Sequence, residues 1–305
     1  MKKKNSLLVL FTKLVLTTTL FISAINSLSG QIYTPGAGVN DVDGNNYQTI
    51  IINGQEWMAE NLRTSKYSNG EDIPHVTDIN LWSTLSNGAW IYMLNDIQFE
   101  IPFGKLYNWY TVNDNRNVCP LGWRVPSESD WNTLIGYLDP NQNPLADINN
   151  ATLGVQSAIA GGKMKSTDTQ YWINGNFGAT NESGFTGQPG GNLESAVSNW
   201  NTTGYYGEFW SSTVYSQNSN YAWQRRIIYE NADIKRLARD ITFGMSIRCV
   251  KDNTTNINEL NYNEIIPKKL VKITDILGKE INQKSNEIIF IHYSDGSIEK
   301  RIVVE

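Results

Sequence analysis

The clearest helical repeat in this chain of 305 residues is short and isolated. Ser127 and Asp130 precede it at the spacing of an approximate capping box, and Asp139-Pro140 marks its end. We therefore expect a helix between about residues 127 and 139, with its apolar face in the core. That face recurs at positions i, i+3, i+4 and i+7 and consists of Trp131, Leu134, Ile135 and Leu138.

Most of the remaining chain is rich in residues that make turns. It contains 36 Asn and 24 Gly, which adopt positive φ angles and close turns readily. Hydrophobic residues still make up 40% of the chain, which favours a packed core over a disordered chain. Residues 171–210 are dominated by Gly, Asn, Ser and Thr without a sustained period, which indicates long ordered loops of the kind that carry binding sites. The sequence thus predicts a loop-rich α+β domain.

The sequence contains a pattern that predicts a β-hairpin. Asn53-Gly54 separates two β-prone runs, and both central residues of such a turn take positive φ angles. Segment 151–160 is compatible with either a second helix or an insertion. Strands are expected at 47–52, 55–59, 209–215, 221–229 and 245–250.

The ionisable residues exclude several classes of function. The formal net charge is −5, which excludes a dedicated nucleic-acid binder because such a protein needs a surplus of Lys and Arg. Two His and two Cys are too few for a multi-ligand zinc site, and we expect no cofactor. Segment 41–46 resembles a calcium loop, but Asn46 and Ile52 stand where the loop needs Gly and Glu. We therefore expect a turn there and no metal site.

The first 30 residues are typical of a secretory signal peptide. Lys2, Lys3 and Lys4 precede an apolar stretch at 6–24, and small residues before Gln31 offer a cleavage site. The alternative is an uncleaved membrane anchor, because the stretch is about long enough to span a bilayer. No other segment approaches that length, so we expect no integral membrane span in the mature chain. The sequence predicts a secreted or outer-surface protein, with residues 31–40 as a linker.

Export would place the two cysteines in an oxidising compartment. Cys119 and Cys249 have only each other as partners. If they pair, they close a loop of about 130 residues, and the chain-entropy model gives about 4–5 kcal/mol of stabilisation. The alternative is a pair of buried free thiols.

The C-terminal part of the chain predicts a separate small β unit. Residues 253–267 are Asn-rich without a clear period and indicate a linker, and residues 268–305 contain three short β-prone runs. This tail resembles the sorting domain of proteins exported by the type IX secretion system, which implies the secretion machinery as a partner. The alternative is a plain β appendage. The residues that carry the resemblance are Asp275, Gly278 and Lys279 in a first turn, Asp295 and Gly296 in a hairpin, and Lys300 and Arg301 in the last strand.

Six motifs occur in order between residues 41 and 252. They are Trp57 to Leu62 (WMAENL), Gly104 to Tyr110 (GKLYNWY), Cys119 to Pro126 (CPLGWRVP) with Trp131, Ala179 to Phe185 (ATNESGF), Phe209 to Thr213 (FWSST) and Ser246 to Val250 (SIRCV). This set resembles the Fibrobacter succinogenes major paralogous (FISUMP) domain. The resemblance implies a C-type-lectin-like fold, related to that of the formylglycine-generating enzymes, in which a disulfide joins the helix region to the last strand.

The sequence offers little for catalysis. No Gly-x-Ser-x-Gly elbow is present. The run from Arg124 to Trp131 is similar to one in the formylglycine-generating enzymes, but the late loops lack the redox cysteines which that chemistry needs. We therefore do not expect an enzyme. A pair of carboxylates that meets only in the folded chain remains an alternative, and it would make the protein a polysaccharide-directed hydrolase.

The binding hypothesis rests on aromatic residues in and after the long loops. Trp and Tyr stack on sugar rings and make contacts of low entropic cost with protein partners. The lectin signatures Glu-Pro-Asn and Trp-Asn-Asp are absent, so a ligand would bind without calcium. We expect a non-catalytic module that binds a glycan or another surface macromolecule, with a purely structural surface protein as a further alternative. The candidate binding residues are Trp200, Tyr205, Tyr206, Trp223 and Arg225, of which Trp223 is alternatively core.

Overall fold

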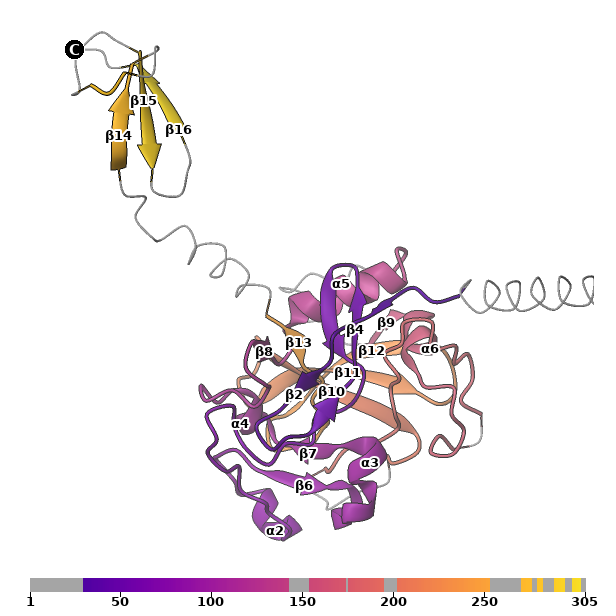
Figure 1. Ribbon diagram of the computed structural model, residues 1–305. Helices are drawn as coiled ribbons and strands as arrows, with labels where there is room; N and C mark the ends of the chain where they lie inside the picture. The colour runs from indigo at the N-terminus through magenta and orange to yellow at the C-terminus, as the bar shows by residue number, and fades with distance from the viewer. Residues whose placement is uncertain are drawn as a thin grey trace, which may run out of the picture. The chain divides into compact units, whose positions relative to one another are not determined.

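The computed structural model divides the chain into two compact units, residues 1–251 and 252–305 (Figure 1). It describes residues 30–142, 154–173, 175–194, 202–252, 270–275, 279–281, 288–293 and 298–302. The predicted signal peptide, apart from Gly30, and the predicted linker at 253–267 lie outside the described residues. The first unit has mixed α+β character and is mostly β.

A five-stranded antiparallel sheet joins the two ends of the first unit. Its order is β1 (Thr34–Pro35), β4 (Thr49–Ile52), β5 (Gln55–Met58), β13 (Val250–Lys251) and β8 (Trp123–Arg124). The predicted hairpin is confirmed, because Asn53 and Gly54 connect β4 to β5 with φ angles of 48° and 75°. Segment 31–40, which we expected to be a linker, instead carries β1 and β2 (Val39–Asn40), since Thr34 pairs with Ile51 and Val39 with Tyr47.

A four-stranded antiparallel sheet forms the second layer. Its order is β10 (Tyr206–Val214), β11 (Tyr221–Ile228), β12 (Ile234–Asp240) and β9 (Gly154–Ser157). Strands β10 and β11 follow the expected runs, whereas the sequence analysis did not anticipate β12. Strand β9 occupies the segment for which we considered a helix or an insertion. Two small sheets pair β2 with β3 (Asn46–Tyr47) and β6 (Trp90–Tyr92) with β7 (Lys105–Tyr107).

The predicted helix is confirmed as α5 (Glu128–Leu138). Ser127 is its N-cap, and the reciprocal hydrogen bonds with Asp130 complete a capping box. Trp131, on the apolar face, is fully buried and packs 5.0 Å from Trp57 between ring centroids. The other helices are single turns: α2 (Ile79–Trp82), η1 (Met93–Asn95), η2 (Ile97–Phe99), α3 (Glu100–Phe103), α4 (Trp109–Val112) and α6 (Ala160–Met164).

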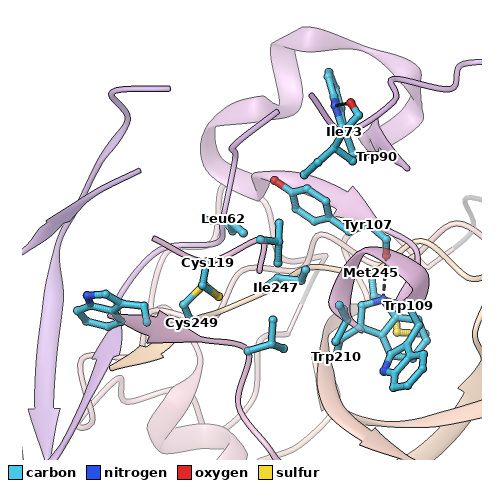
Figure 2. Close-up of a cluster of buried hydrophobic side chains, with 14 of the residues drawn as sticks. Leu62, Ile73, Trp90, Tyr107, Trp109, Cys119, Trp210, Met245, Ile247 and Cys249 are labelled. Carbon is cyan, nitrogen blue, oxygen red and sulfur yellow. Dashed lines mark hydrogen bonds between the residues drawn. A yellow bond between two sulfur atoms is a disulfide. The ribbon is translucent and has the colours of Figure 1, made fainter. Parts of the chain in front are cut away.

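A second part of the core surrounds the disulfide (Figure 2). Cys119 and Cys249 are bonded, with their Cα atoms 6.0 Å apart, so the pairing prediction is confirmed and the free-thiol alternative is wrong. The bond ties the segment before α5 to the segment before β13. Close by, Trp210 donates its indole N–H to the carbonyl of Tyr107 at 2.8 Å, which satisfies a fully buried polar group.

The second unit is a three-stranded antiparallel sheet. Its order is β14 (Leu270–Thr274), β15 (Ile288–Tyr293) and β16 (Ile298–Ile302). Asp275 and Lys279 close a turn after β14, because the Lys279 N–H donates to the Asp275 carboxylate at 3.0 Å and the Asp275 N–H to the Lys279 carbonyl at 2.9 Å. Gly278, Asp295 and Gly296 lie outside the described residues, and the sorting role stays a prediction.

Helices in the described part of the chain are short. None of them has both the length and the hydropathy that crossing a bilayer requires.

Removing the disulfide tests its contribution to the core. We expect the double substitution Cys119→Ala, Cys249→Ala to lower the free energy of unfolding by about 4–5 kcal/mol, because the denatured chain regains the entropy of a loop of about 130 residues. Urea unfolding monitored by tryptophan fluorescence measures the loss. The oxidised parent protein is the reference, and an unchanged midpoint would contradict the prediction.

Candidate functional site

Two of the five candidate binding residues belong to the interior. Trp223 is 1% exposed and Arg225 is 0% exposed, so neither presents a surface to a ligand. The reason is the register of the second sheet. Arg225 stands opposite Phe209 and Arg236 on the face that α5 covers, and its guanidinium donates to Glu128 at 2.7 and 3.1 Å. We therefore remove both residues from the candidate surface.

Glu128, Arg225 and Arg236 form a fully buried ionic triad. Arg236 donates from Nε to the second Glu128 oxygen at 2.6 Å, and its guanidinium lies 3.6 Å from the centre of the Trp223 ring. All three charged side chains are 0% exposed. Burying unpaired charges is very unfavourable, so each group depends on the others for its place in the core. The triad is structural and fixes α5 on the sheet.

Tyr205 and Tyr206 lie at the surface and meet a third tyrosine. All three side chains are half-buried. The rings of Tyr205 and Tyr229 are 5.2 Å apart in an edge-to-face arrangement, and those of Tyr205 and Tyr206 are 6.3 Å apart. We name Tyr205, Tyr206 and Tyr229 the tyrosine cluster. Trp200, the remaining candidate, lies outside the described residues.

The strand pairing places the tyrosine cluster at one end of the second sheet. Strand β10 begins at Tyr206, opposite Ile228 at the end of β11, and the Tyr229 N–H donates to the Tyr205 carbonyl at 3.1 Å. Gly204 turns the chain into β10 with a φ angle of 83°, which favours glycine. The three rings therefore meet because two strand ends are paired.

A loop with two exposed apolar side chains is hydrogen-bonded through its backbone to this part of the chain. The N–H of Ile173 donates to the Gly204 carbonyl at 2.9 Å, and the N–H of Phe177 donates to the Tyr229 carbonyl at 2.8 Å. Both side chains face water, since Ile173 is 38% exposed and Phe177 is 61% exposed. Exposed aromatic and aliphatic groups that adjoin one another are typical of a binding surface.

A polar network borders the tyrosine cluster. The Arg226 guanidinium lies 4.4 Å from the centre of the Tyr206 ring and donates to Glu208 at 2.7 Å from Nε. The Glu208 side chain is fully buried and also accepts from Gln224 at 3.2 Å and from Asn192. The carboxylate of Glu208 thus holds Arg226 over the Tyr206 ring, which restrains both side chains.

Lys165 anchors the loop and the strand end beneath the cluster. Its side chain is 0% exposed and its ammonium donates to three carbonyls, those of Phe177 at 2.7 Å and of Ile228 and Asn231 at 2.9 Å. Burial lowers the pKa of Lys165 to about 8. One buried cation therefore joins the loop that carries Phe177 to the strand that leads into Tyr229.

The described ranges contain no group of three or more His, Cys, Asp or Glu side chains that could hold a metal ion. The calcium-like segment is a turn, as expected: Asp41 accepts from the N–H groups of Asp43 at 3.0 Å and Asn45 at 2.9 Å. His75 is exposed and stacks on Trp90 with 3.8 Å between ring centroids.

The sequence analysis identified Tyr205 and Tyr206 as candidate binding residues but not Tyr229 or Phe177. Tyr229 was assigned to a strand, and Phe177 to an undifferentiated loop. Tyr229 had a usable signal, because it ends a β-prone run where a polar Glu230-Asn231 turn begins. Phe177 had none, since its position depends on the long-range contacts of Lys165.

Comparison with known proteins gives one match. The family model described as the Fibrobacter succinogenes major domain matches residues 50–251. No curated protein and no solved structure matches the chain.

The structural assignment of Arg225 predicts a stability defect. We expect Arg225→Ala to lower the free energy of unfolding by about 3–5 kcal/mol, because it leaves Glu128 in the core with one partner fewer. Urea titration measures the change. Lys235→Ala, on the neighbouring strand and half-buried, is the control and should change stability little. A stable Arg225→Ala protein would contradict the triad's role.

The lowered pKa of Lys165 predicts a rise of stability with pH. Between pH 8 and about 10.5 the unfolded chain binds more protons at this residue than the folded chain does, so alkaline pH favours the folded state. We expect the difference in unfolding free energy between the parent and Lys165→Met to grow in the parent's favour by up to about 1 kcal/mol per pH unit. Urea titrations at pH 7.5, 8.5 and 9.5 measure it, and a constant difference would contradict the assignment.

Proposed function

The chain belongs to the Fibrobacter succinogenes major domain family, and from this premise we propose that it is a secreted or cell-surface module that binds a glycan without catalysis. The observation that carries the proposal is the tyrosine cluster, in which three half-buried rings meet at the surface beside the exposed Phe177.

The tyrosine cluster has the chemistry that a sugar needs. The C–H groups of a pyranose pack on aromatic faces, and its hydroxyls find donors and acceptors in phenol groups. The rings are restrained before a ligand arrives, because Tyr205 packs against Tyr229 and Arg226 lies over Tyr206. Tyr contacts of this kind lose little side-chain entropy on binding. The metal-free mode that the sequence predicts agrees with a surface made of tyrosine rings and a guanidinium.

The carboxylates nearest the tyrosine cluster favour binding over hydrolysis. Glycoside hydrolysis uses two carboxyl groups that are free to act as acid, base or nucleophile. Here Glu208 is held by Arg226, Gln224 and Asn192. Glu230 accepts the hydroxyl of Tyr229 at 2.8 Å. Both carboxylates position neighbouring groups, so hydrolysis enters the experiment only as an alternative outcome.

The proposal also includes export from the cell and a C-type-lectin-like fold. A disulfide is typical of proteins in oxidising compartments, which supports export. The turn between Asp275 and Lys279 lies after a first strand, as in the sorting tails that the sequence resembles. A bonded cysteine pair that links the helix region to the last strand also agrees with a C-type-lectin-like arrangement.

Truncating the cluster tests the proposed function. After a glycan array has identified a ligand, we expect Tyr205→Ala and Tyr229→Ala each to weaken its binding by about two- to tenfold, because an aromatic contact contributes about 0.5–1.5 kcal/mol. Isothermal titration calorimetry measures the affinity, with and without EDTA. Tyr137→Ala is the matched control, since Tyr137 is 45% exposed on α5 and lies outside the tyrosine cluster.

Three outcomes would count against the proposal. Release of reducing sugar that is lost on a single Asp or Glu substitution would make the protein a hydrolase. An array without any bound glycan would favour a purely structural surface protein. Binding that EDTA abolishes would contradict the metal-free mode.

A further inference from the structure

A depression separate from the tyrosine cluster lies on the first unit. It has a volume of about 130 Å³ and lies between segments 59–63, 100–104 and 186–188, with Arg248 in its lining. Its wall is apolar on one side, where Ile101 and Pro102 stand, and Ile101 is 70% exposed. The depression shares no residue with the tyrosine cluster.

Arg248 is a buried cation without a carboxylate partner in the described part of the chain. Its side chain is 0% exposed. Asn61 accepts from Nε at 3.1 Å and from Nη2 at 2.7 Å, and the carbonyl of Phe185 accepts from Nη1. These bonds use three of the five N–H groups of a guanidinium. The other two have no acceptor among the described residues.

The position of the guanidinium is fixed. The amide of Asn61 donates to the Phe103 carbonyl at 2.8 Å and to the Ser246 hydroxyl at 3.1 Å, so its oxygen is held toward Arg248. The guanidinium also lies 4.1 Å from the centre of the Phe185 ring. Burial lowers the pKa of Arg248 to about 9, and the group therefore still carries its charge at neutral pH.

The two acidic residues in the lining each have a basic partner. Glu60 is paired with Arg63 at 2.9 Å, and Glu100 with Lys105 at 2.7 Å. Together with Arg248, these groups carry one excess positive charge. Glu60 also attracts the Arg248 guanidinium and would compete with an added anion. A buried cation without an ion-pair partner attracts an added anion more strongly than an exposed cation does, because water screens the buried charge poorly.

We propose that this depression binds a carboxylate group, which the Arg248 guanidinium holds while the apolar wall at Ile101 and Pro102 receives the carbon to which it is attached. A planar guanidinium matches a planar carboxylate in shape and hydrogen-bonding pattern. One excess positive charge matches one carboxylate, and a volume of about 130 Å³ holds a small group. The carboxylate belongs either to a free organic acid or to a uronic acid residue of a glycan.

Calorimetric titration of the full chain with matched pairs of compounds tests the proposal. At constant ionic strength, we expect sodium acetate to bind and acetamide, its uncharged counterpart, not to bind. Glucuronate against glucose then distinguishes the two sources: binding of both acids assigns the site to uronic acids, and binding of acetate alone assigns it to free acids. Inorganic phosphate is the third arm, and tighter binding of phosphate than of either acid would overturn the proposal.

Variants locate the binding in the depression. Ile101→Asp places a negative charge at the rim, and we expect it to weaken acetate binding roughly tenfold. Glu60→Gln removes a competing charge from a side chain that is 41% exposed and should strengthen binding severalfold. Leu121→Asp makes the same change of net charge at a site that is 92% exposed and outside the lining, and should leave binding unchanged.

Arg248→Lys keeps the charge but loses the planar group, so it should abolish binding. If this variant does not fold, Ile101→Asp and Glu60→Gln still test the proposal, because the first should weaken acetate binding and the second should strengthen it. Acetate binding that is absent from the parent protein would overturn the proposal. Equal effects of Ile101→Asp and Leu121→Asp would do the same. Tyr205→Ala should leave acetate binding intact, so failure of the tyrosine cluster to bind glycan does not affect this test.

Discussion

The carboxylate of Glu128 is the interaction on which the second sheet depends. It lies in the first turn of α5 and pairs with Arg225 on β11 and Arg236 on β12, which are 97 and 108 residues away. If either strand shifted by one residue, its arginine would point to the opposite face of the sheet. The buried Glu128 carboxylate would then lose one of its two ion pairs. The triad therefore fixes the register of β11 against β12. Tyr205 immediately precedes β10, and the pairing of β10 with β11 brings it beside Tyr229.

What could be predicted from the sequence depended on how local the cause was. The capping box of α5, the Asn53-Gly54 turn and the pairing of two lone cysteines follow from residues close together or from simple counting, and the structure has all three. Strand β12 was missed because Ile234–Asp240 carries Lys, Arg and Asp and looks like a surface segment. Arg225 was misassigned for the same reason. Only the fold shows that a distant glutamate pairs with both inward-facing arginines.

The two candidate surfaces use different physical means. The tyrosine cluster offers large, half-polar rings whose positions come from paired strand ends and from a lysine that joins three carbonyls. The depression offers one charge, held in place by an amide that is itself fixed by two hydrogen bonds. In both places, hydrogen bonds from a buried polar side chain fix the positions of the neighbouring groups. A chain with many loops can in this way hold its surface side chains in one arrangement.

The position of β13 has a consequence for how the protein is made. Val250 pairs with Trp57 on one side and Arg124 on the other, so a strand from the end of the first unit separates two that precede it by more than a hundred residues. As a ribosome extends the chain, the sheet stays divided until this strand emerges. Contacts of such long sequence separation form late and slowly. The five-stranded sheet of this protein therefore cannot be complete until nearly all of the first unit has been synthesised.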